Sequence, residues 1–105
     1  EARAALERGI AHAAEELSSQ AAADSRLRML LDHDRLDDLG RIGAPTLVFG
    51  ASDDMIVPLS HAREIAAHIP GAKLVEMSGG HFFPQTAPAS FAEHAIRFLR
   101  DGDPA

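Results

Sequence analysis

Two aspartates and one histidine have the residue types and the spacing for acid–base chemistry. Asp53 and Asp54 follow the apolar run 46–49 by four and five positions, and His81 follows the run 73–77 by four. Both runs are predicted strands, and the carboxyl ends of parallel strands form the edge where open α/β sheets place active sites. A carboxylate beside an imidazole can fix the ring tautomer and stabilise its cation. The spacing therefore predicts an Asp–His pair at this edge.

Each of these residues also has a purely structural explanation. An aspartate between a strand and a helix is most often a turn former or a cap, and a lone histidine in a loop is most often solvated. The joint placement on adjacent strand ends, with Gly79-Gly80 before the histidine, favours the chemical interpretation. The apolar neighbours Phe82 and Phe83 are predicted either to line a pocket or to pack under the last helix, and Met55 and Ile56 carry the same two alternatives.

The remaining histidines are weaker candidates. His61 and His68 lie seven positions apart on one predicted helix, whereas metal-binding pairs favour i, i+4 spacing with a supporting carboxylate. The acidic turn at residues 33–38 lacks the ordered oxygens and the glycine of a calcium loop. A solvated surface is the favoured interpretation of both, so we expect no metal site.

The first part of the chain is predicted to be helical. Residues 1–39 contain no proline and are rich in alanine, leucine, glutamate and arginine, which are strong helix formers. Apolar residues at three- and four-residue steps, the last of them Leu17, predict one amphipathic helix. Asp24-Ser25 offers an N-cap for a second, shorter helix with its own leucine face.

In the second part of the chain the spacing of apolar residues changes, and the new pattern predicts a βαβ unit. A crossover of more than twenty residues between two strands requires that the strands be parallel. The run 46–49 has no polar face, which is typical of a strand buried on both sides. The predicted elements are a strand at 46–49, a helix after Pro58 that ends at 70–71, a strand at 73–77 and a closing helix at about 88–100.

Composition limits the classes of protein to which the chain can belong. The chain has 105 residues, 46% hydrophobic and 25% charged, with a net charge of −6, which suits one globular domain at most and disfavours binding to nucleic acid or an anionic membrane. The absence of cysteine excludes a disulfide framework and a thiol nucleophile. No apolar run approaches the ~20 residues of a membrane span, and no signal peptide is visible, so a cytoplasmic location is expected.

The segments 45–58, 69–72 and 78–82 resemble the C-terminal portion of the α/β-hydrolase-fold enzymes. The similar stretch extends from about Asp37 to Leu99. The resemblance implies the fold class α/β, with the last two parallel strands of the hydrolase sheet and their flanking helices, preceded by a helical cap segment. It also implies two domains in the chain, with residues 1–36 as a helical cap or lid segment and residues 37–105 as the C-terminal part of the core.

The resemblance assigns roles to individual residues. In that family the acid of the catalytic triad precedes a proline by four residues, which selects Asp54 before Pro58 rather than Asp53. The catalytic base follows a glycine after the last strand, which selects His81. The Gly-x-Ser-x-Gly elbow that carries the nucleophile is absent from this chain. The most similar segment, residues 50–54, lies in the acid loop and ends in aspartate, so Ser52 is not expected to be the nucleophile.

These roles imply a hydrolase whose nucleophile lies elsewhere. We expect the C-terminal fragment or subunit of an α/β-hydrolase that hydrolyses an ester, thioester, lactone or amide of a small molecule, with the triad serine on a missing N-terminal part or chain. The expected partners are that part and the substrate, with no cofactor, nucleic acid or membrane. The alternative is a non-catalytic binding or assembly partner that retains the scaffold, although retention of both Asp54 and His81 argues against it.

Overall fold

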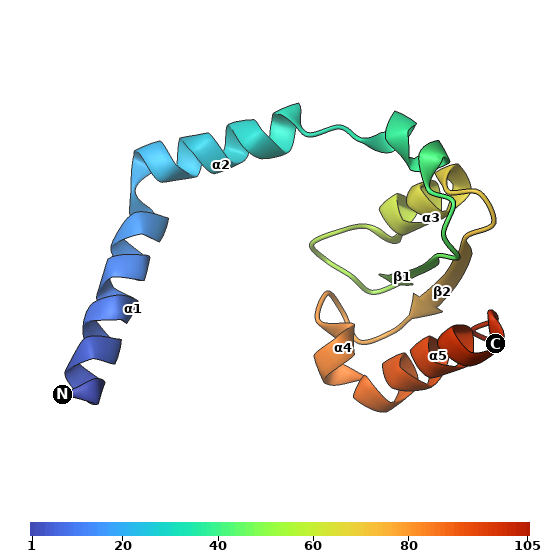
Figure 1. Ribbon diagram of the computed structural model, residues 1–105. Coiled ribbons are helices and arrows are strands. Elements are labelled where there is room, and N and C mark those ends of the chain that lie inside the picture. The colour runs from blue at the N-terminus through green and yellow to red at the C-terminus, as the bar shows by residue number, and fades with distance from the viewer. The chain divides into compact units, whose positions relative to one another are not determined.

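The computed structural model describes the backbone of residues 1–105 and all side chains except those of residues 16–18. The predicted contribution of Leu17 to an apolar face therefore lies outside the described side chains. The chain divides into two compact units, residues 1–34 and residues 35–105, and each is described by itself (Figure 1). The assignment of residues 1–36 to a cap stays a prediction.

The first unit consists of two helices, α1 (Ala2–Ser18) and α2 (Gln20–Asp32). Ser19 is the N-cap of α2, and its hydroxyl oxygen accepts a hydrogen bond of 3.1 Å from the backbone N–H of Ala22. The predicted N-cap at Asp24-Ser25 is wrong. Because Ser19 already caps the preceding turn, Asp24 lies inside α2, where its carboxylate accepts from the side chain of Gln20.

The second unit is a short α/β arrangement of six elements. The predicted strand at 73–77 is confirmed, and the first strand begins and ends slightly later than predicted. A short helix of four residues, 83–86, follows His81 and was not predicted from the sequence. The elements are the 3-10 helix η1 (Leu36–Arg41), β1 (Leu47–Ala51), α3 (Leu59–His68), β2 (Lys73–Met77), α4 (Phe83–Thr86) and α5 (Pro88–Asp101).

β1 and β2 pair in parallel, from Leu47 opposite Lys73 to Ala51 opposite Met77, which confirms the predicted βαβ unit. Alternate residues of each strand face opposite sides. One face packs on α3, where Gly50 lies so near the helix that a Cβ would meet the Cβ of Ala62 at 2.6 Å. The two helices α3 and α5 lie on opposite sides of the sheet (Figure 1).

The core of this unit lies on the α5 side of the sheet. Ala51, Val75 and Met77 are buried there, and Phe83 and Phe91 pack against them. Leu47, Val48 and Phe49 are only half-buried, because the sheet of the described chain has two strands. Of the helices in the part of the chain that the structure describes, none is long and apolar enough to cross a membrane.

Candidate active site

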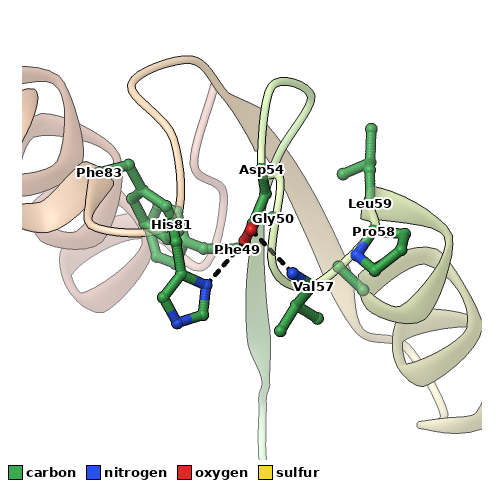
Figure 2. A pocket seen from close by; sticks show the side chains of 9 residues that line it. Phe49, Gly50, Asp54, Val57, Pro58, Leu59, His81 and Phe83 are labelled. Atoms are coloured by element: carbon green, nitrogen blue, oxygen red, sulfur yellow. Dashed lines mark hydrogen bonds and ion pairs between the residues drawn. The ribbon is translucent and has the colours of Figure 1, made fainter.

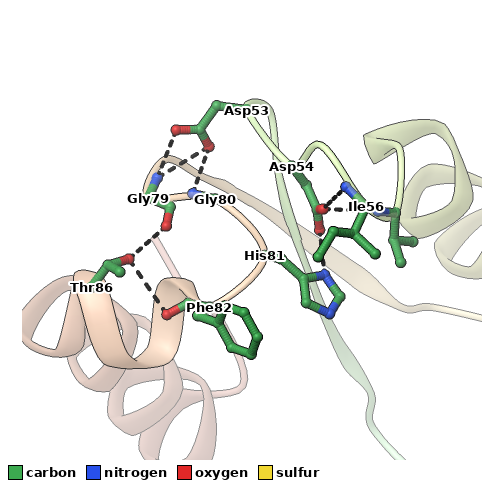
Figure 3. A network of polar contacts seen from close by, with 9 residues as sticks. Asp53, Asp54, Ile56, Gly79, Gly80, His81, Phe82 and Thr86 are labelled. Carbon is green, nitrogen blue, oxygen red and sulfur yellow. Dashed lines mark hydrogen bonds and ion pairs between the residues drawn. The ribbon is translucent and has the colours of Figure 1, made fainter. Parts of the chain in front are cut away.

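The loop after β1 fixes the carboxylate of Asp54 through its own backbone. One oxygen, Oδ1, accepts hydrogen bonds of 2.8 Å from the backbone N–H groups of Ile56 and Val57. This is the local turn that an aspartate favours at the start of a loop. The second oxygen, Oδ2, is left to point across to the loop after β2 (Figure 3). The turn therefore sets the direction of the free carboxylate oxygen.

His81 contacts the free carboxylate oxygen of Asp54. Its Nδ1 lies 3.0 Å from Oδ2 of Asp54, and the side chains of Asp54 and His81 are 8% and 37% exposed. The two residues are 27 positions apart in the chain, so the contact depends on the parallel pairing of β1 with β2. The other ring nitrogen, Nε2, points away from Asp54 (Figure 2). The structure thus brings together the acid and the base that the sequence predicted as a pair.

The protonation of Asp54 determines the tautomer of the ring. The hydrogen bond from the backbone N–H of Val57 is the largest cause that lowers the pKa of Asp54 below its ordinary 3.8, and the contact with His81 lowers it further, while burial opposes both. Asp54 is therefore a carboxylate at neutral pH and only accepts hydrogen bonds. The neutral ring makes the 3.0 Å contact only with its proton on Nδ1, which leaves Nε2 free to accept one.

Asp53 points in the other direction and contacts the backbone of the histidine loop. Its two oxygens accept from the N–H of Gly79 at 3.1 and 3.0 Å, and Oδ1 also accepts from the N–H of Gly80 at 3.0 Å (Figure 3). The bonds from Gly80 and then Gly79 are the largest causes that lower the pKa of Asp53. Adjacent aspartates therefore contact the same loop at different points.

A pocket of about 180 Å³ opens beside the pair. Asp54 and His81 supply its ionisable groups, and Phe83 lines its wall (Figure 2). Phe83 also packs against Phe49 and Phe91, so both alternatives considered for it are correct. The remaining residues that line the pocket are Phe49, Gly50, Val57, Pro58, Leu59 and Ala62.

Other candidates from the sequence do not join the site. Met55 and Ile56 are exposed, at 94% and 66%, and neither lines the pocket. The hydroxyl of Ser52 donates to the carbonyl of Met77 at 3.3 Å. No group of three or more metal-ligating side chains occurs among the described residues, and His68 binds a backbone carbonyl of its own helix.

Sequence reasoning named Asp53 as a candidate but did not predict its contact with the histidine loop, and it missed Thr86, which contacts the same loop. The hydroxyl of Thr86 donates to the carbonyl of Gly79 at 2.6 Å. For Asp53 the sequence did contain a signal, since consecutive glycines expose two adjacent N–H groups that form an anion-binding concavity. For Thr86 there was none, because the short helix α4 was not predicted.

Comparisons with known proteins show which family the chain resembles. A family described as serine hydrolase (FSH1) matches residues 11–92. Proteins assigned the name carbamate hydrolase RutD from Caulobacter sp. (strain K31) and Klebsiella pneumoniae subsp. pneumoniae are 42% and 40% identical over 71% and 73% of this chain. The crystal structure of a hydrolase from Pseudomonas aeruginosa PA01 superposes with a TM-score of 0.62 and 37% identity over 65% of this chain.

The chain is similar to only one part of these larger proteins. It spans 28% of the length of each of the two named relatives and 26% of the solved hydrolase. The parallel strands and their helices match the solved neighbour, which confirms the expected fold class, the C-terminal portion of an α/β-hydrolase fold. This chain therefore belongs to the serine hydrolase (FSH1) family, within the α/β-hydrolase superfamily.

Proposed function

We propose that this chain carries the acid and the base of a Ser-His-Asp triad that hydrolyses an ester, thioester, lactone, amide or carbamate of a small molecule. The observation that carries the proposal is the 3.0 Å contact between Nδ1 of His81 and Oδ2 of Asp54, with Nε2 directed away from the pair (Figure 2). Asp54 is the triad acid and His81 is the general base.

In the first half of the reaction His81 activates the nucleophile. Its Nε2 takes the proton of the serine hydroxyl as the serine oxygen attacks the carbonyl carbon of the substrate. The ring becomes an imidazolium, and Asp54, which is ionised because its pKa is lowered, stabilises that cation. The imidazolium then returns the proton to the leaving group as the bond to that group breaks, and an acyl-enzyme remains.

In the second half water replaces the serine. Nε2 of His81 takes a proton from water as the water oxygen attacks the acyl carbon, and the same proton then returns to the departing serine oxygen. The acid product leaves and the enzyme is restored. No redox step or external group is required. The half-exposed ring of His81, at 37%, is accessible for both proton transfers.

The serine is proposed to lie in a part of the full-length hydrolase that is N-terminal to this chain. The relatives are more than three times as long as the region that matches this chain, and the Gly-x-Ser-x-Gly elbow that carries a serine nucleophile is absent from this chain. The partner is therefore the N-terminal part of the same hydrolase, and the helices of residues 1–36 are proposed to be its cap. We include carbamates among the proposed substrates because the relatives carry the name carbamate hydrolase. A carbamate carbonyl is attacked in the same way as an ester carbonyl.

Labelling with a fluorophosphonate probe tests this proposal in the full-length protein that contains the chain. We expect a serine to be labelled in the parent, and labelling to be lost in His81→Ala because the general base is gone. His61→Ala, on the exposed side of α3, is the matched control and should label as the parent does. An unlabelled parent, or equal labelling of the His81 variant, would overturn the proposal and favour the non-catalytic binding partner.

A further inference from the structure

We propose that Asp53 is a positioning residue for the reaction, which holds the backbone of the Gly79–Gly80 loop so that the ring of His81 reaches Asp54. This inference rests on the proposed function of the Asp54–His81 pair. It assigns to two adjacent aspartates two different tasks, one on the imidazole and one on the chain that carries it.

The hydrogen bonds of Asp53 link two loops that are far apart in the sequence. Its carboxylate accepts three contacts of 3.0 to 3.1 Å from the N–H groups of Gly79 and Gly80. Both glycines have positive φ, at 124° and 75°, a conformation that turns successive N–H groups toward one point. A carboxylate is the natural occupant of such a concavity, because each bond is assisted by its charge.

The same peptide is held from its other side by the helix that follows. Thr86, in α4, donates its hydroxyl to the carbonyl of Gly79 at 2.6 Å. A Cβ on Gly79 would meet the Oγ1 of Thr86 at 2.5 Å, so the peptide passes closely between the two side chains. Asp53 and Thr86 therefore clamp Gly79 through its N–H and its carbonyl (Figure 3).

His81 follows this clamped segment directly, and no strand or helix holds it. The acid loop is tied to the end of β2 as well, because the N–H of Ser52 donates to the carbonyl of Met77 at 2.9 Å. Three consecutive residues, Ser52, Asp53 and Asp54, thus contact three successive parts of the second loop. Loss of the middle contact should let His81 move relative to Asp54 while the ends stay attached.

This arrangement predicts a specific kinetic signature. A ring that leaves Asp54 for part of the time is less often in position to transfer a proton, so kcat falls, whereas substrate affinity does not depend on that contact. The expected signature is therefore a fall in kcat at nearly constant KM.

Hydrolysis of p-nitrophenyl acetate by the full-length protein tests the inference, with active sites counted by fluorophosphonate titration. Asp53→Ala should lower kcat per active site by about 10²-fold and change KM less than twofold. Asp53→Asn should have a smaller effect, because its amide oxygen still accepts while its NH₂ group faces a donor. Glu76→Gln, which removes the exposed ion pair with Arg63, is the matched control and should match the parent.

A purely structural role predicts a different result. It would lower the number of titrated sites or the Tm and leave kcat per site unchanged, and that outcome overturns the inference. If Asp53→Ala does not fold, Thr86→Val removes the other half of the clamp and should also lower kcat per site with little change in KM, with rescue by Thr86→Ser. If Asp54→Asn and His81→Ala lose activity while the Asp53 and Thr86 variants do not, only this inference fails. If none of them loses activity, the proposed function fails.

Discussion

The described large apolar side chains in the helices of residues 1–34, such as those of Leu30 and Leu31, are exposed, whereas residues 35–105 bury a small cluster around Val75 and Met77. Hydrogen bonds differ in the same way. In the first unit, side chains bind residues three or four positions away, as Arg3 does with Glu7. The second unit has such local bonds too, but it also has side-chain hydrogen bonds between residues 13 to 27 positions apart, as between Asp54 and His81.

The difference separates structure that depends on nearby sequence from contacts that depend on the tertiary fold. α1 and α2 form from helix propensity, i to i+4 contacts and the Ser19 cap, and all three depend only on nearby sequence. The Asp54–His81 contact depends on two loops that one strand pairing brings together. Substitutions should therefore have small effects in the first unit and large ones in the second, and matched pairs of variants measure that contrast.

The largest contrast is expected in catalysis. Asp54→Asn, in the full-length protein, should lower kcat by roughly 10⁴-fold because the amide favours the wrong tautomer of His81. Asp32→Asn, the same change at the end of α2, should leave kcat within twofold. Hydrolysis of p-nitrophenyl acetate measures both. Comparable losses in the two variants would show that the first unit shares in the chemistry and would break the comparison.

A smaller contrast is expected in stability. Met77 in β2 is 5% exposed, and Met29 in α2 is 65% exposed. Met77→Ala should lower the free energy of unfolding by about 2–5 kcal/mol because it leaves a cavity in the core. Met29→Ala should change it by about 0.5 kcal/mol or less, as exposed positions do. Urea denaturation of the full-length protein measures both. A large cost at Met29 would mean that α2 packs against residues outside this chain.

The smallest contrast is expected in the response to acid. The pKa values of Asp53 and Asp54 are lowered below 3.8, so their contribution to loop stability is fully present above that pH and is lost as the pH falls through the lowered values. Hydrogen exchange of the Gly79 and Gly80 amides should then lose protection. The amide of Ala22, bound to the neutral hydroxyl of Ser19, should keep its protection. Loss of loop protection well above pH 3.8 would contradict the lowered pKa values.

Several features of the site were predictable from the residues. The strand 73–77, the parallel pairing and the proximity of Asp53 or Asp54 to His81 followed from apolar runs and spacing, because parallel strands end at one edge, and the family resemblance selected Asp54. The N-cap of α2 was predicted wrongly, because both Ser19 and Asp24-Ser25 have capping side chains and only the completed turn distinguishes them. The helix α4 was missed because four residues, with Pro84 among them, contain too little periodicity to identify.

The sequence by itself determined most of the local elements, the parallel order and the two loops that carry the aspartates and His81, and the family resemblance selected Asp54. Only the tertiary structure decided how Asp53 and Asp54 divide their contacts. Asp53 and Asp54 have identical side chains. Their contacts differ because the turn after β1 directs one carboxylate to the backbone of Gly79 and the other to the ring of His81. That direction depends on backbone geometry and on groups 26 and 27 positions away, which no local pattern encodes.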